Sequence, residues 1–421
     1  MAGEPRGDSA PLEVADAVAR ILAEVRALAA VKRPLLDAYN GVLAADAVAP
    51  VTLPPWDNSA MDGYACRAAD ITRVPVTLRV VETIAAGHFP ARALGAGEAA
   101  RIMTGAPVPA RADTVVRVED TDAGIATVEI RDGRDAGRNV RPRGEDIVAG
   151  RVAIAAGTTI GAAQIGVLAS LGFAEVEVVR APRVAILTSG DELVELERFD
   201  EVRAGRRIVS SNGYTLRALV RAAGAEAEYL GIAADTPQSL RALLERARSC
   251  DMIITSAGIS VGEHDYMRGV LREMDAEMKF WRVRMRPGAP LAFGLLGGKP
   301  WIGLPGNPVS TMVTFELFAR PALHKMRGLT KVFRRPVPVV LEQPVTTNAA
   351  LTHFLRAVVT VQDGRATARL TGPQSSGILT SMSDANALLV VPADRRNVGV
   401  GETLNAIFIG DDAERASDFA L

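Results

Sequence analysis

The sequence has few of the residues that usually hold metal ions or link small domains covalently. Its two cysteines, Cys66 and Cys250, lie far apart and outside any CxxC spacing, so neither a zinc knuckle nor a disulfide framework is expected. The four histidines are scattered, without metal-ligand or Ser/His/Asp spacing. No apolar run approaches the roughly 18 residues that span a bilayer, and no signal-peptide pattern is visible. We therefore expect a soluble protein of the reducing cytoplasm, without membrane association.

An excess of charge of one sign is also missing. The 48 Lys and Arg residues balance 49 Asp and Glu residues, which removes the general attraction that nucleic-acid binders exert on phosphate backbones. Nucleic acid is thus not an expected partner. A chain of 421 residues is too long for one ordinary core, and its length favours about three domains.

The hydrophobic pattern divides the chain into four regions. Short Val-rich runs separated by Pro and Gly predict a β-rich inserted domain over residues 49–147. The segments on either side, 1–48 and 148–180, contain helical periodicity and together form one discontinuous domain. Strands alternate with helices of 10 to 15 residues over 181–331, which predicts an α/β domain with a parallel sheet. Residues 332–421 are β-like and predict a small C-terminal β domain.

Four polar loops follow predicted strands of the α/β domain, at residues 187–193, 231–235, 255–265 and 304–310. Ligands of open parallel sheets bind outside the carboxyl ends of the strands. Small residues let backbone N–H groups approach an anion, and a following helix N-terminus adds positive potential. We expect these loops to bind phosphate or a similar oxyanion, although any one of them could equally be an ordinary turn.

Carboxylates accompany these loops, namely Asp191, Glu192, Asp235, Glu263 and Asp265. Mg²⁺ prefers oxygen ligands and often shares them with substrate phosphates, so acids beside an anion site suggest metal-assisted chemistry. Helix N-capping explains Asp191 and Asp265 equally well.

Three arginines alternate in the segment WRVRMRPG, at positions 282, 284 and 286. In a single strand they would share one face and could bind a multiply charged anion. The alternative is a solvated edge strand.

Nine motifs, in order, resemble those of the MoeA family of molybdopterin molybdenumtransferases, to which the gephyrin C-terminal domain is related: PPWDNSAMDGYA, RIMTGAPVP, RPRGEDI, TSGDEL, SNGYTLRALV, SVGEHDY, FWRVRMRPG, GLPGNPVS and ANALLVVP. The resemblance implies an α/β multidomain fold with a central parallel-sheet molybdopterin-binding domain. The β-rich inserted domain, a discontinuous linking domain and a C-terminal β-barrel-like domain complete it.

The implied reaction inserts molybdate into adenylylated molybdopterin and releases AMP, with Mg²⁺ or another divalent cation assisting. The resemblance also implies a homodimer with a composite active site. Molybdopterin adenylyltransferase and apo-molybdoenzymes are possible further partners.

Site residues are carried over from the motifs by position in this sequence. The catalytic set is Asp57, Thr104, Asp146, Glu192 and Asp265, with Glu192 and Asp265 as metal ligands. The substrate-binding set is Ser256, Gly258, Ser260, Gly262, Asp235, Arg282, Arg286, Pro305, Gly306, Asn307, Arg356 and Ser376.

Two positions depart from the family pattern. Ala289 stands where PGKP motifs have lysine, and Ala257 stands where glycine is usual. The retained acids favour the transferase, whereas Ala289 favours the alternative of a molybdopterin-binding carrier or scaffold without turnover.

Overall fold

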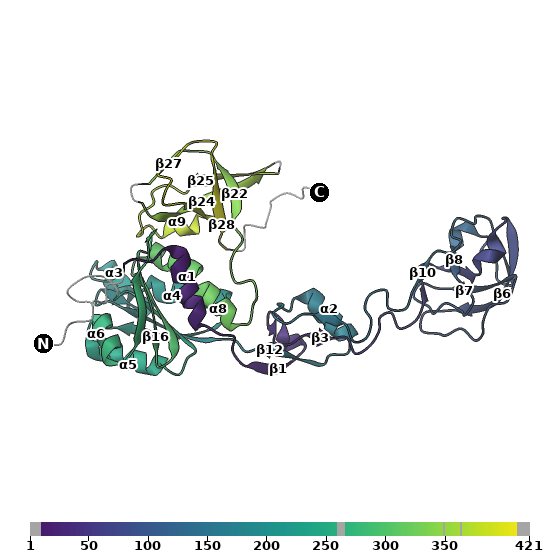
Figure 1. Cartoon of the computed structure of the whole chain (residues 1–421), viewed down its shortest axis with the longest axis horizontal. Coiled ribbons are helices and arrows are strands. Elements are labelled where there is room, and N and C mark those ends of the chain that lie inside the picture. Colours follow the sequence, from purple (N-terminus) through teal and green to yellow (C-terminus); the bar gives the residue numbers. More distant parts are fainter. Residues whose placement is uncertain (1–9, 259–265, 348–349, 363, 411–421) are drawn as a thin grey trace.

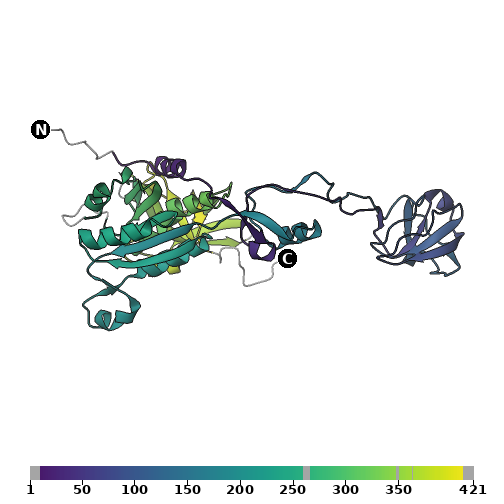
Figure 2. The same cartoon turned by 90° about the horizontal axis from the view of Figure 1, so that it is seen from below.

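The computed structural model describes residues 10–258, 266–347, 350–362 and 364–410. These residues form an elongated molecule, with an α/β domain and a small barrel at one end and a β-rich domain at the other (Figure 1, Figure 2). A linking domain lies between them and continues into a stalk of two chain segments, residues 49–57 and 142–151. No helix in the described part of the chain is long and apolar enough to cross a membrane.

The α/β domain is built on a six-stranded sheet with the order β16-β13-β17-β21-β20-β18. In that order the strands span Glu226–Ala233, Arg183–Ser189, Met252–Ser256, Lys299–Leu304, Pro290–Leu296 and Glu277–Arg282. The first four are parallel, as the alternation of strands and helices predicts. Strand β20 runs antiparallel to both of its neighbours, because Gly297 and Gly298, both at positive φ, form a tight hairpin turn between β20 and β21, and β18 again has the direction of the first four strands.

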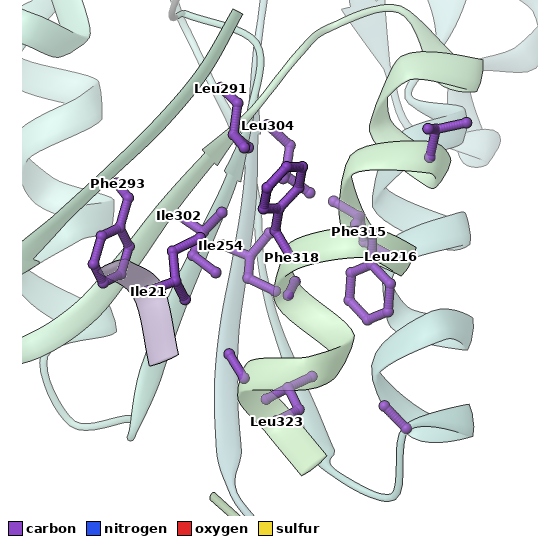
Figure 3. Close-up of a cluster of buried hydrophobic side chains, with 14 of the residues drawn as sticks. Ile21, Leu216, Ile254, Leu291, Phe293, Ile302, Leu304, Phe315, Phe318 and Leu323 are labelled. Carbon is purple, nitrogen blue, oxygen red and sulfur yellow. The ribbon is translucent and has the colours of Figure 1, made fainter. Parts of the chain in front are cut away.

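Neighbouring residues of the central strands enter different cores, because side chains alternate across a strand. Ile254 and Ile302 pack with the helices on one face, where Figure 3 shows them beside Leu216 and Phe318. Ile253 and Trp301 pack on the other face. The first face carries α4 (Ser211–Ala222), α7 (Pro308–Thr314) and α8 (Arg320–Met326), and the second carries α5 (Pro237–Ala247) and α6 (Tyr266–Glu273).

Helix α1 (Val14–Glu24) belongs to the α/β core, which differs from the predicted placement of residues 1–48 in the linking domain. Ile21 is fully buried in the core of Figure 3, because the apolar face of α1 packs against α8. The three-stranded sheet of the linking domain starts at β1 (Ala30–Pro34) and includes β12 (Glu175–Val179) and β2 (Val42–Leu43). Helix α2 (Ala162–Ser170) covers it. The pair β3 (Ala47–Val48) and β11 (Val152–Ile154) leads into the stalk.

The β-rich domain holds a five-stranded sheet with the order β8-β5-β7-β6-β9. Its strands span Thr114–Arg117, Gly63–Cys66, Glu98–Ile102, Val76–Ile84 and Thr127–Ile130. Apolar clusters lie on both faces of this sheet, so the domain has its own core. The short pair β4 (Asn58–Ser59) and β10 (Val140–Arg141) joins it to the stalk.

The C-terminal region is a closed five-stranded barrel, because β24 pairs with both β25 and β26. Around the barrel the strands are β24 (Thr352–Gln362), β25 (Arg365–Leu370), β22 (Val337–Leu341), β28 (Thr403–Phe408) and β26 (Ala387–Val391). Strand β19 (Met285–Arg286), from the α/β region, adds to β24. Together these domains confirm the expected α/β multidomain fold with a C-terminal barrel.

Candidate active site

Two adjoining cavities lie beside the carboxyl ends of the central strands. One, of about 440 Å³, is formed by loops of the α/β domain, and the other, of about 750 Å³, lies between that domain and the barrel. Pro290, Asn307 and Ser310 line both cavities, which are therefore two compartments of one cleft. We call the first the polar compartment and the second the cationic compartment.

The polar compartment has no lysine or arginine in its described lining, and Glu192 is its one charged side chain. Ser211 and Asn212 come from the first turn of α4, and Pro308 and Ser310 from the first turn of α7. Helix N-termini carry partial positive charge and unpaired N–H groups. This compartment can therefore receive a phosphate or a polar heterocycle through backbone groups alone.

A chain of hydrogen bonds joins three of the loops. Asn212 Nδ2 donates to Ser256 Oγ at 2.8 Å and to the Gly306 carbonyl at 2.7 Å. Ser256 Oγ in turn donates to the Pro305 carbonyl at 3.1 Å. The Ser256 hydroxyl is buried and fully engaged, so it fixes the loops and does not offer a free proton to a ligand.

The loop after β13 carries the acids. A side chain at Gly190 would place its Cβ 2.7 Å from a Glu192 carboxylate oxygen, so the absence of a Cβ here gives that carboxylate its position. Asp191 and Asp235 hold their loops together, since the Asp235 N–H donates to Asp191 Oδ1 at 3.1 Å. Arg207 donates to the Asp191 carbonyl.

Arg286 provides exposed positive charge in the cationic compartment. It lies beside Gly288, which has φ +101°, and a Cβ there would meet Thr314 Cγ2 of α7 at 2.4 Å. Only glycine fits between this turn and the helix. The pairing of β19 with β24 sets Arg286 opposite His353 at the mouth of the barrel.

Arg356 is the second cation of this compartment and is fully buried. Its guanidinium donates to Ser381 Oγ at 3.0 Å and to the carbonyls of Gln374 and Ser375 at 3.2 and 3.0 Å. Burial lowers the pKa of this guanidinium, and an arginine side chain keeps its charge in a protein at neutral pH. Arg356 thus adds positive potential and shapes the loop that ends at Ser376.

Ser376 connects the two compartments. Its hydroxyl accepts a hydrogen bond from Asn307 Nδ2 at 3.0 Å, and its carbonyl accepts one from the Val309 N–H at 3.2 Å. These bonds join the barrel to the N-terminus of α7. The position of the barrel therefore determines the shape of the cationic compartment.

The chain matches three family models in succession. They describe the MoeA N-terminal region (domain I and II) at residues 12–172, a probable molybdopterin binding domain at 185–325, and the MoeA C-terminal region (domain IV) at 338–409. A molybdopterin molybdenumtransferase 2 of Mycobacterium tuberculosis is 39% identical over 91% of this chain and 96% of its own length.

The chain belongs to the MoeA family. A molybdopterin molybdenumtransferase of Staphylococcus aureus is 33% identical over 96% of the chain and 97% of its own length. The crystal structure of a molybdopterin biosynthesis moeA protein from Pyrococcus horikoshii OT3 superposes with a TM-score of 0.83 at 27% identity, covering 95% of this chain and all of that one. These findings confirm the resemblance drawn from the nine motifs.

Most of the residues carried over from the MoeA pattern lie in the cleft. The polar compartment is lined by Glu192, Ser256, Gly258, Pro305, Gly306 and Asn307, and the cationic compartment by Arg286, Asn307, Arg356 and Ser376. Asp235 lies just behind the lining, at the loop that holds Asp191. Ser260, Gly262 and Asp265 lie outside the described residues.

Three predicted catalytic residues lie away from the cleft of their own chain. Asp57 is the last residue of the stalk segment 49–57, next to the β-rich domain, and Thr104 lies in that domain, at the opposite end of the molecule (Figure 1). Both are engaged: Asp57 Oδ1 accepts from the Arg143 N–H at 2.7 Å, and the Thr104 N–H and hydroxyl both donate to Asp62. Asp146 lies in the stalk and lines a separate cavity beside Val148.

The three alternating arginines do not share one face, contrary to the expectation from WRVRMRPG. Strand β18 ends at Arg282, which is exposed and lines neither compartment. Arg284 pairs with Glu13 at 2.7 Å, next to α1. Only Arg286 reaches the cleft, because the chain leaves the first sheet after Arg282 and joins the barrel at Met285.

Both departures from the MoeA pattern lie in the cleft. Ala289 lines the cationic compartment, and Ala257 lines the polar one with φ +77°. The structure also reveals Asn212, Ser310 and Gln374, which were not predicted as site residues. Asn212 could have been found, since it follows a strand and opens a helix within the quoted motif SNGYTLRALV.

Proposed function

We propose that this protein is a molybdopterin molybdenumtransferase of molybdenum cofactor biosynthesis, which inserts molybdate into adenylylated molybdopterin and releases AMP. The names of its relatives support this activity. The structural observation that carries the proposal is the division of one cleft into a polar and a cationic compartment.

The two compartments suit the two proposed substrates. In the polar compartment the first turns of α4 and α7 bind the phosphate-bearing substrate, and the bonds from Asn212 hold the loops in place. In the cationic compartment Arg286 binds molybdate, since a guanidinium can donate two parallel hydrogen bonds to an oxyanion. Pro290, Asn307 and Ser310 form the boundary across which the substrates meet.

Arg356 and Ser376 support the oxyanion side. Arg356 keeps a charge beneath the compartment and orders the loop before Ser376, while Asn307 orients the Ser376 hydroxyl. Because these groups are already fixed, they need no rearrangement when the anion binds. Such preorganisation favours catalysis of the transfer over binding of the anion alone.

A divalent cation, Mg²⁺ by preference, completes the proposed site. Among the described side chains no group of three or more His, Cys, Asp or Glu residues could hold a metal. Within the described lining of the cleft, Glu192 alone offers a hard carboxylate, and Mg²⁺ commonly takes one or two carboxylates together with substrate phosphate oxygens. Glu192 would hold it, with Asp265 as the second ligand implied by the family pattern. The bound cation would neutralise charge on the departing phosphate.

A homodimer is the proposed working form. Asp57 and Thr104 are too remote to serve their own cleft, whereas a twofold arrangement would bring the β-rich domain of one chain to the cleft of the other (Figure 1). Val148, Val152 and Val167, between 39% and 51% exposed, gather on the stalk and linking domain and offer an apolar surface for this contact.

The proposed compartment is the cytoplasm, where Cys66 and Cys250 would remain the buried free thiols that the structure contains. Molybdopterin adenylyltransferase and apo-molybdoenzymes are proposed as partners that supply the substrate and receive the product.

One assay tests the function directly. Purified protein is incubated with adenylylated molybdopterin, molybdate and Mg²⁺, and AMP release is measured together with reconstitution of an apo-molybdoenzyme. We expect both signals, and we expect Arg286→Ala to lower both while the exposed control Arg369→Ala leaves them unchanged. AMP release without any reconstitution, or neither signal, would contradict the proposal.

A further inference from the structure

A further cavity, of about 580 Å³, lies at the seam between the linking domain and the α/β domain. We call it the seam cavity. Its walls come from β1, the turn at Leu36–Ala38, the end of β12, the last turn of α4 and Arg327 after α8. The first turn of α4 lines the active-site cleft, and its last turn lines the seam cavity. The two sites are therefore separated by the length of this 12-residue helix, about 18 Å.

The lining of the seam cavity is strongly basic. It contains Arg33, Arg180, Arg221 and Arg327 but only one carboxylate, Asp37. Arg180 is neutralised by Asp251, with two contacts of 2.6 Å. In the part of the chain that the structure describes, the other three arginines form no ion pair.

Arg327 is the half-buried member of this set. Its Nη1 donates to the Ala223 carbonyl at 3.0 Å and its Nη2 to the Asn40 carbonyl at 2.6 Å. The guanidinium lies against Gly224, where a Cβ would come within 2.2 Å of Cζ. Desolvation lowers the pKa of the Arg327 guanidinium, which means that burial disfavours its charged form. Among the described residues no acidic partner offsets this effect.

The helix dipole explains only part of this arrangement. Arg221 and Arg327 lie at the C-terminal end of α4, where positive charge is favourable. Arg33 comes from a strand of the other domain and gains nothing from that helix. A cation from each side of the seam faces a common cavity, an arrangement that suits an anion placed between them.

We propose that the seam cavity binds a small molecule bearing a phosphate group, held by Arg33, Arg221 and Arg327. Guanidinium groups match the oxygens of phosphate in pairs and bind them more tightly than neutral donors do. Tyr39, a residue that is 57% exposed, also lines the cavity and can stack on a base. The phosphate can therefore come from free inorganic phosphate or from a nucleoside monophosphate.

Binding at this seam bears on the rest of the molecule. The ligand joins β1 of the linking domain to the end of α4, and the linking domain carries the stalk and the β-rich domain (Figure 1). Phosphate binding therefore fixes the direction in which the β-rich domain extends, without any contact to the cleft.

The test is a calorimetric titration of the full chain with inorganic phosphate and, separately, with AMP, against chloride at equal ionic strength. All proteins carry Arg286→Ala, which weakens oxyanion binding in the cationic compartment. Phosphate bound in the polar compartment is common to every protein compared, so the seam cavity is measured by the difference between the seam variant and the matched control. The seam variant adds Arg33→Glu and Arg221→Glu, which are exposed and leave Arg327 in place. The matched control adds Arg20→Glu and Arg246→Glu, two exposed arginines elsewhere with the same change in charge.

We expect a phosphate site in the matched control whose affinity is at least about tenfold weaker in the seam variant. AMP binding more tightly than phosphate, with the advantage lost in Tyr39→Ala, identifies a nucleotide site. Equal affinities identify a site for the phosphate group alone. Equal phosphate affinity in the seam variant and the matched control, or no binding in either, overturns the proposal.

Discussion

The two compartments of the cleft obtain their affinity for anions in different ways. The polar compartment is built by one domain from backbone loops and two helix N-termini, without a cation in its described lining. The cationic compartment lies where two domains meet and depends on Arg286 and the buried Arg356. The first is a property of the sheet edge, whereas the second exists only when the barrel is docked.

This difference has a mechanical consequence. Substitutions in the barrel should first alter oxyanion binding in the cationic compartment, because Ser376 accepts hydrogen bonds from Asn307 and from the Val309 N–H at the start of α7. Substitutions in the loops of the α/β domain should first alter phosphate binding in the polar compartment, through Asn212 and Ser256. The four predictions below test this division, from the largest expected effect to the smallest.

Arg356→Ala should break the cationic compartment. It leaves Ser381 Oγ and the Gln374 and Ser375 carbonyls without their buried donor. We expect a loss of about 3–4 kcal/mol in the free energy of unfolding of the barrel. Chemical denaturation followed by circular dichroism measures this, and the exposed Arg369→Ala should change it by less than about 0.5 kcal/mol. Equal stability of the two variants would contradict the bracing role of Arg356.

Mixed dimers test whether the cleft needs a third part from the partner chain. A heterodimer of one Asp57→Ala chain and one Arg286→Ala chain should regain about half of wild-type turnover, because both lesions fall in one of two composite sites. The crossed control pairs a chain carrying both substitutions with a wild-type chain, and it should be inactive. If the crossed control is active and the first heterodimer is not, Asp57 serves its own cleft.

Ala289→Lys should strengthen the cationic compartment. A mobile ammonium beside Arg286 adds one charge-assisted hydrogen bond, which we expect to tighten molybdate binding about tenfold. Titrations at two salt concentrations measure this, with the exposed Ala242→Lys on α5 as the control. Unchanged molybdate affinity would show that Arg286 and Arg356 already supply all the positive charge that molybdate binding requires.

Ala257→Gly should relax the polar compartment. Ala257 has φ +77°, where a Cβ costs about 1–2 kcal/mol, and the greater chain entropy of unfolded glycine offsets part of the gain. We expect the free energy of unfolding to rise by about 0.5–1 kcal/mol. Ala242→Gly, within helix α5, should instead lower it by about 1 kcal/mol. Similar destabilisation by both substitutions would mean that Ala257 is not strained.

Local patterns in the sequence were sufficient for the order of the elements and for the loops at the sheet edge. The alternation of strands and helices predicts the parallel part of the sheet, since hydrophobic periodicity and turn residues act over a few positions. For the same reason Glu192, Ser256 and Asn307 could be assigned to loops after strands, where the cleft lies.

The tertiary structure decided what those patterns cannot encode, because pairing and docking depend on contacts between distant residues. It placed α1 in the α/β core and separated Arg282, Arg284 and Arg286 by passing the chain from one sheet to another. It also closed the barrel through the pairing of β24 with β26. Local sequence thus determined which residues stand at the sheet edge, and long-range packing decided which of their side chains face the cleft.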